Sequence, residues 1–173
     1  MDMTTFATIS TILSLALFGG FVLLGFRRFG ILSSYSSYAR KWTEAVPINN
    51  HTHLWSIVTI VTALLLVPAM IEAGDESPLQ FLGFAAPVYL GVVGFTPEYE
   101  TKHKQMVVHF IGTVICSAAA VLWLVIALRE WYQIPIALAV FGVIGFLTQT
   151  LRKSYVLWLE LSMFAAVYAA VLI

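Results

Sequence analysis

The sequence predicts an all-α protein, a polytopic transmembrane helical bundle of about six helices that forms one domain over residues 1–173. Hydrophobic residues make up 60% of the chain and charged residues only 10%, against about 45–50% and about 25% in soluble domains. Several apolar runs approach the roughly 20 residues that cross a bilayer as a helix. The loops between these runs alternate in charge. A transmembrane barrel would instead need strands of roughly 10 residues with alternating polarity.

Six apolar runs are the predicted transmembrane helices. They cover residues 6–26, 54–71, 79–95, 106–128, 132–150 and 155–173. The first follows Asp2 rather than a basic segment and is too long for the core of a signal peptide, so we expect it to be retained as a helix. The third is the shortest and contains Pro87, which packing against neighbouring helices can accommodate in a membrane. A re-entrant segment is the alternative for this run.

The charges of the loops predict the orientation of the bundle. Basic residues gather in three connections: Arg27, Arg28, Arg40 and Lys41, then Lys102 and Lys104, then Arg152 and Lys153. The connections between them carry Glu72, Asp75, Glu76 and Glu130, with Arg129 as the single basic residue. Because Lys and Arg accumulate on the cytoplasmic side, both termini are predicted to be non-cytoplasmic. Trp42 and Trp55 at one boundary and Trp131 at the other are predicted interfacial anchors.

Charge, cysteine content and small residues limit the partners. Nine basic and nine acidic residues balance, which argues against nucleic acid as a partner. The single cysteine, Cys116, excludes an intramolecular disulfide. The predicted partners are the lipid bilayer of a bacterial inner (plasma) membrane and a lipid or small-molecule ligand. Small residues four apart, as at Gly112 and Cys116, suit packing within the chain, and a homo-oligomer is the alternative.

Glu160 is the most informative single residue, because it lies about 10 Å beyond Lys153 within the last apolar run. A carboxyl at that depth must be protonated, paired or beside a wet cavity. It is a candidate catalytic base, and the alternative is a hydrogen bond that fixes a neighbouring helix. His109 begins a polar stripe with Thr113, Cys116 and Ser117 on one helical face. A His109 and Glu160 pair could relay protons, bind a metal or be structural.

A second group of candidate residues lies in the predicted cytoplasmic loops. Imidazole and carboxylate groups bind zinc and other divalent metals, so these side chains could hold a divalent metal such as zinc, although the sequence identifies no cofactor. The candidate ligands are His51, His53, His103 and His109, and Glu98 is a second candidate base beside Glu160. Their spacing matches no specific zinc signature. Solvated loop histidines that contact lipid headgroups are the alternative.

Three segments carry a resemblance to known membrane proteins: residues 30–38 (Gly-Ile-Leu-Ser-Ser-Tyr-Ser-Ser-Tyr), 94–97 (Gly-Phe-Thr-Pro) and 108–112 (Val-His-Phe-Ile-Gly). In their order, the chain resembles uncharacterised small six-helix membrane proteins of bacteria and their phages. More distantly it resembles membrane proteins of the Frag1 and DRAM type. The resemblance implies six helices and little about activity, since no catalytic motif accompanies it. Seven-helix hydrolases related to ceramidases also use His and Ser, but this chain lacks their helix count and their intramembrane Asp.

These observations lead to three functional hypotheses. The first is a non-catalytic membrane bundle that binds a lipid, a small ligand or a protein partner. The second is a metal-dependent membrane hydrolase that acts on lipid at the cytoplasmic interface, through the histidines and Glu98 or Glu160. The third is a proton-coupled transporter or small channel in which Glu160 and His109 titrate.

Overall fold

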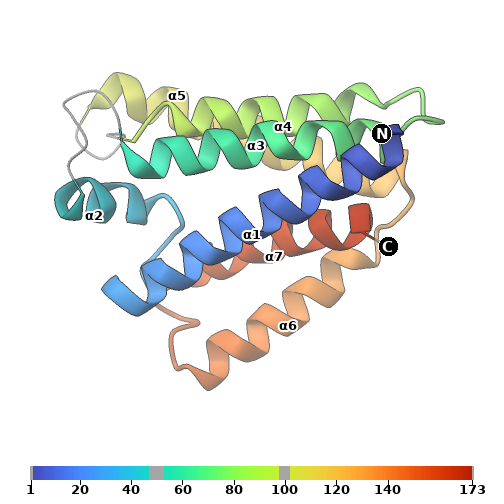
Figure 1. The fold of residues 1–173 in the computed structure, drawn as a ribbon. Helices are drawn as coiled ribbons and strands as arrows, with labels where there is room; N and C mark the ends of the chain where they lie inside the picture. The colour runs from blue at the N-terminus through green and yellow to red at the C-terminus, as the bar shows by residue number, and fades with distance from the viewer. Residues whose placement is uncertain (1, 47–52, 98–101, 173) are drawn as a thin grey trace.

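The chain folds into seven α-helices and one π-helical turn over residues 2–46, 53–97 and 102–172, which the computed structural model describes (Figure 1). The α-helices are α1 (Met3–Phe29), α2 (Ser37–Ala45), α3 (Leu54–Ala73), α4 (Phe81–Gly94), α5 (His103–Leu122), α6 (Gln133–Leu147) and α7 (Tyr155–Leu172). The π-helical turn η1 (Trp123–Ala127) continues α5 directly. The predicted all-α fold is therefore confirmed.

Four helices are long and apolar enough to cross a membrane: α1, α3, α7 and the continuous helix His103–Ala127. The remaining apolar helices, α4 and α6, have 14 and 15 residues. Together these helices correspond to the six predicted apolar runs. The chain is thus a multi-span helical membrane protein that associates with the lipid bilayer.

Helix α2 was not among the predicted elements, because its mean composition is polar. It places Tyr38, Ala39 and Trp42 on its buried side and Arg40 and Lys41 on its outer side. Such a short helix gains its stability from packing rather than from intrinsic propensity. Gly30, which ends α1 with a φ of 74°, turns the chain toward it.

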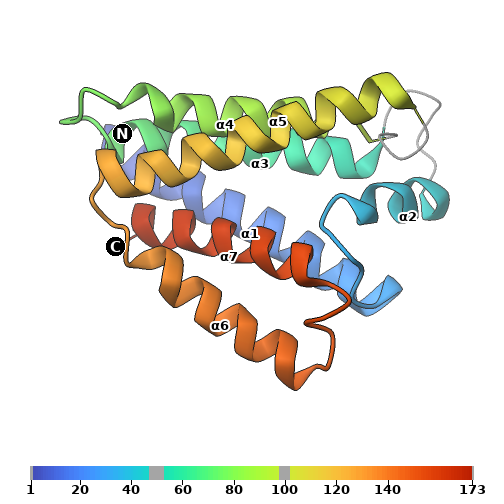
Figure 2. The same cartoon turned by 180° about the vertical axis from the view of Figure 1, so that it is seen from behind.

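Helix α1 contacts two groups of helices. One group is α3, α4 and α5, and the other is α6 and α7. Helix α3 packs against α1 and α4, α4 packs against α5, and α6 packs against α7. Helix α7 lies beside α1 in both views, and α6 lies on the outside of the bundle (Figures 1 and 2). Both termini lie at one end of the bundle, and α2 lies at the other. This arrangement brings the basic connections to the end that carries α2.

Close approach between helices depends on small residues within the chain. A Cβ atom at Gly83 of α4 would lie 2.6 Å from the carbonyl oxygen of Met70 in α3. The indole Nε1 of Trp123 donates a hydrogen bond of 3.2 Å to the same carbonyl, which is one of the last in α3 and therefore lacks a helical partner. A Cβ atom added at Gly112 would likewise lie only 3.2 Å from Cγ2 of Val93. These glycines serve packing within the chain.

The surface of the bundle is rich in large apolar side chains. On α6, Phe146 and Leu147 are 73% and 72% exposed, and on α5 Val114 is 65% exposed. Exposed apolar side chains in such number mark contact with lipid or with another protein. The prediction of Trp42 and Trp55 as interfacial anchors is wrong, because packing against α1 and the 30–36 segment buries both rings. Trp131 is exposed.

Candidate functional site

Residues 30–36, between α1 and α2, dock on the first turns of α7. The amide of Leu157 donates to the carbonyl oxygen of Ser33 at 3.0 Å, and the amide of Tyr35 donates to Glu160 Oε2 at 2.6 Å. The amides in the first turn of a helix have no partner inside it, so the Ser33 carbonyl satisfies one of them. We call residues 30–36 the docking segment.

Tyr35 anchors the docking segment in the interior of the bundle. Its ring is buried beside Phe18 and Trp55, with ring centroids 5.2 and 5.6 Å away. The Thr59 hydroxyl already donates to the Trp55 carbonyl at 2.8 Å, so the Tyr35 hydroxyl is the donor in its 3.0 Å bond to Thr59 Oγ1. Burial raises the pKa of the Tyr35 phenol above its ordinary range, which keeps this donor protonated.

The next residue, Ser36, connects the docking segment to α5. Its hydroxyl lies 3.0 Å from His109 Nε2, while Thr96 Oγ1 lies 2.9 Å from His109 Nδ1. The Thr96 hydroxyl donates to the Val93 carbonyl, so we assign the proton of the neutral His109 ring to Nδ1. Nε2 then accepts from Ser36. His109 thus connects the end of α4 to the docking segment.

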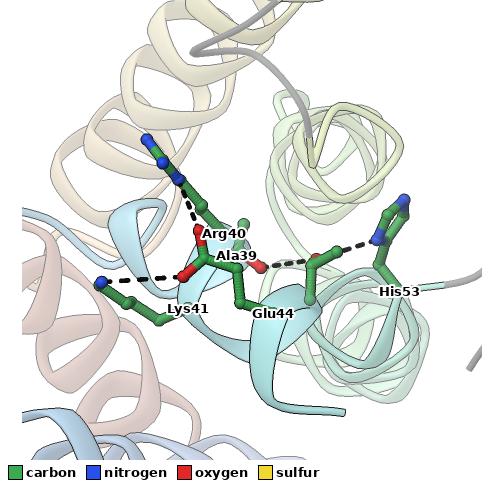
Figure 3. A network of polar contacts seen from close by, with 6 residues as sticks. Ala39, Arg40, Lys41, Glu44 and His53 are labelled. Carbon is green, nitrogen blue, oxygen red and sulfur yellow. Dashed lines mark hydrogen bonds and ion pairs between the residues drawn. The ribbon is translucent and has the colours of Figure 1, made fainter. Parts of the chain in front are cut away.

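His53 occupies a similar structural position beside α2 (Figure 3). Thr43 Oγ1 donates to the Ala39 carbonyl at 2.8 Å and therefore accepts from His53 Nδ1 at 2.9 Å. On the outer side of α2, Glu44 contacts Arg40 at 2.8 Å and Lys41 at 3.8 Å. The hydrogen bond from Arg40 lowers the pKa of Glu44. These ion pairs are exposed, so they contribute little to stability.

A cavity of about 230 Å³ lies between α3, α4, α5 and α7. Tyr35, Ser36 and Glu160 give it a polar end. Most of the remaining wall is apolar, but α5 adds a stripe of Thr113, Cys116 and Ser117. The prediction that this stripe faces the bundle holds in part, because Thr113 and Cys116 are half-buried and Ser117 is exposed. An apolar cavity with a few polar groups at one end is typical of small-molecule sites.

Glu160 is the distinctive group of this cavity. Its Oε2 atom accepts from the Tyr35 amide, and Oε1 has no hydrogen-bond partner among the residues that the structure describes. Of the described residues that line the cavity, none is Lys, Arg or His. A carboxyl in apolar surroundings is costly unless a proton, a cation or a hydrogen bond compensates it. Oε1 is therefore available to a group inside the cavity.

A second, wider cavity of about 1340 Å³ lies at the opposite end of the bundle, where the termini are. Its lining includes Glu72 at the end of α3 and Asp75, Glu76 and Arg129 from the connecting loops. Glu72 Oε1 accepts a 2.6 Å hydrogen bond from Thr4 Oγ1, which ties α1 to the end of α3. Among the described residues, these acidic side chains form no group of three or more that could hold a metal ion.

The predicted metal ligands have separate environments where the structure describes them. His53 and His109 are buried and contact threonine and serine hydroxyls, while His103 is exposed at the start of α5. Within the described ranges, no group of three or more His, Cys, Asp and Glu side chains could hold a metal. His51 and Glu98 lie outside the described residues. The divalent metal site and its catalytic base therefore stay predictions.

Glu160 and His109, which the sequence suggested as a pair, are connected through the docking segment. Each side chain contacts the docking segment, at the consecutive residues Tyr35 and Ser36. Sequence reasoning missed Tyr35, Thr59 and Thr96 as parts of this arrangement. A signal was present in the serine- and tyrosine-rich run over residues 33–38, which is unusually polar between two apolar helices.

Comparisons of this chain with protein-family models, with curated proteins and with solved structures found no match.

Proposed function

We propose that this chain is an integral membrane protein that binds a small amphipathic molecule in the cavity between α3, α4, α5 and α7. The observation that carries the proposal is the Glu160 Oε1 atom, which has no hydrogen-bond partner among the described residues and belongs to the polar end of an otherwise largely apolar cavity. A polar group of the ligand would contact Glu160. Its apolar part would lie against Leu66, Met70 and Val167.

The size of the cavity suits one small ligand. An apolar cavity of about 150 Å³ is known to take up benzene, so about 230 Å³ accommodates a somewhat larger group. Val167 lies seven residues beyond Glu160 in α7, which is about 10 Å along the helix axis. Counted with the bond from its first carbon to the polar atom, an extended chain of eight carbons has eight bonds and spans roughly 10 Å.

The rim of the cavity favours entry from the bilayer. Ser117 on α5 and Leu159 on α7 both line the cavity and are exposed, Leu159 by 49%. Helices α5 and α7 both face the viewer in Figure 2. In the membrane this side of the bundle meets lipid, so an amphipathic molecule dissolved in the bilayer would reach the cavity sideways.

A substitution at the rim tests the proposal. Ser117→Phe places a bulky ring in the cavity, whereas Ala118→Phe adds the same ring to an exposed neighbour outside the lining. Saturable binding of radiolabelled 1-octanol to the protein in phosphatidylcholine nanodiscs is measured by scintillation proximity, with empty nanodiscs as background. We expect Ser117→Phe to weaken binding about tenfold or more and Ala118→Phe to change it less than twofold.

Two results would contradict this function. One is the lack of saturable octanol binding to the wild-type protein. The other is equal binding by the Ser117→Phe and Ala118→Phe variants.

We further propose that all six apolar helices cross the membrane, with both termini on the non-cytoplasmic side. The alternation of loop charge supports this orientation, and the position of both termini at one end of the bundle is consistent with an even number of crossings. Helices α4 and α6 are short for a bilayer, and local thinning or flanking residues accommodate such a mismatch. The resemblance to small bacterial and phage proteins supports a bacterial plasma membrane.

A further inference from the structure

The polar end of the cavity favours ligands of one charge over another, and the proposed binding function does not specify that charge. Glu160 supplies a carboxyl group, and none of the described residues that line the cavity is Lys, Arg or His. The other polar side chains of the lining are neutral hydroxyls and one thiol, at Tyr35, Ser36, Thr113, Cys116 and Ser117. The cavity therefore offers one carboxyl group with no basic side chain among the described residues of its lining.

The geometry of Glu160 favours a donor in the ligand. The Tyr35 amide holds Oε2 at 2.6 Å and so fixes the direction of the carboxyl group. Oε1 is then a fixed acceptor without a partner among the described residues. A ligand group that carries both a positive charge and N–H donors satisfies this acceptor and compensates the carboxylate.

We infer that the ligand is a lipophilic amine, whose ammonium group contacts Glu160 and whose alkyl chain occupies the apolar part of the cavity. This inference rests on the proposed binding function and gives its ligand class. The docking segment matters to it, because Tyr35 and Ser36 form the wall beside the ammonium group. The hydrogen bonds of these residues to Thr59 and His109 hold that wall in place.

The position of Glu160 agrees with an amphiphile that keeps its head near the membrane surface. Glu160 lies five residues after the first residue of α7, or about 7.5 Å along the helix. An amine would therefore contact Glu160 close to the end of the bundle that carries α2, with its chain directed toward the middle of the bilayer. Both a free alkylamine and the amine headgroup of a membrane lipid have this chemistry.

Three probes with the same chain test the inference without any substitution. Octylamine, 1-octanol and octanoate are compared for saturable binding to the wild-type protein in phosphatidylcholine nanodiscs, whose zwitterionic lipid limits nonspecific attraction of amines. We expect octylamine to bind about tenfold or more tightly than octanol, a ratio that corresponds to about 1.4 kcal/mol. We expect octanoate to bind more weakly than both.

Glu160→Gln tests whether the carboxylate is the source of the preference. Gln keeps an oxygen that can accept from the Tyr35 amide, so the docking segment retains its contact. We expect the octylamine-to-octanol ratio to fall close to one in this variant. Glu76→Gln removes the same charge from an exposed loop residue outside the cavity and should leave the wild-type ratio unchanged.

The outcomes distinguish a failure of the amine inference from a failure of the binding function on which it rests. Saturable octanol binding without a preference for octylamine would overturn the amine inference and leave the binding function standing. Lack of saturable binding by all three probes would overturn both. Competition for octylamine by phosphatidylethanolamine in the nanodisc would identify a membrane lipid as the source of the amine, and lack of competition would identify a free single-chain amine.

Discussion

Tyr35 shows how much one residue contributes to this bundle. Its amide holds Glu160, its hydroxyl donates to Thr59, and its ring contacts Phe18 and Trp55. A buried polar group that loses such a partner costs roughly 1–3 kcal/mol. Tyr35 therefore couples the position of the docking segment to the interior of α3 and to the carboxyl group of the cavity.

The buried phenol of Tyr35 predicts a loss of stability in alkali. Burial raises its pKa above the ordinary value of 10.0, so the folded protein holds this proton more tightly than the unfolded chain does. The stability that this difference contributes is fully present below about pH 10 and is lost as the pH rises further. We expect the melting temperature in detergent to decline above pH 10. Tyr35→Phe should make that decline shallower.

Two other tyrosines define the control for this experiment. Burial also raises the pKa of Tyr38, so part of the alkaline decline should remain in the Tyr35→Phe variant. Tyr155 is exposed at the start of α7, and Tyr155→Phe should leave the decline as it is in the wild type. An identical alkaline decline in wild type and Tyr35→Phe would contradict the role of the buried phenol.

At the scale of elements, the contact between α3 and α4 depends on the absence of a side chain. Gly83 leaves room for the Met70 carbonyl and for the indole of Trp123, which lies in the π-helical turn after α5. Three helices therefore meet at one point. Without a hydrophobic drive between helices in lipid, such close backbone approach is a main source of helix association.

Gly83→Ala should weaken this contact. The added Cβ would lie 2.6 Å from the Met70 oxygen and 2.8 Å from Trp123 Nε1, so the helices must separate, at a cost of about 1–3 kcal/mol. Thermal unfolding in detergent, followed by helical circular dichroism, measures the loss. Gly91→Ala is the matched control on the same helix, because nothing lies within 4 Å of its added Cβ. Unfolding of Gly83→Ala at the wild-type temperature would contradict the prediction.

At the scale of the whole molecule, the ends of the bundle differ in charge. The described connections at the α2 end carry Arg40, Lys41, Arg152 and Lys153, while the end with the termini carries Glu72, Asp75 and Glu76. The membrane potential and the anionic lipids of the cytoplasmic leaflet favour basic residues on the cytoplasmic side. Glu160, at the polar end of the cavity, lies near this basic end.

The crossing of the short helix α4 can be tested with single cysteines on either side of it. In a Cys116→Ala background, Ser77→Cys precedes α4 and His103→Cys follows it. A membrane-impermeant maleimide added to intact bacterial cells should label Ser77→Cys. It should label His103→Cys only after the membrane is permeabilised. Labelling of His103→Cys in intact cells would show that α4 does not cross or that the orientation is reversed.

The sequence by itself determined the class of the fold and the positions of the apolar helices. The six predicted runs match the six apolar helices to within a few residues, apart from the π-helical turn after α5. The reason is local: transfer of an apolar segment into lipid depends on its own composition and length. The same local reasoning placed Glu160 inside the last helix and identified it as a candidate site residue.

Only the tertiary structure decided which faces of these helices meet. In a soluble protein the apolar side of a helix indicates the core, but in a membrane the lipid-facing side is just as apolar, so the pattern along α3, α4 and α7 does not show which side is buried. The contact of Tyr35 with Glu160 joins residues 125 positions apart. The cavity exists because segments so distant in the chain pack together with incomplete complementarity, and this property belongs to their combined shapes.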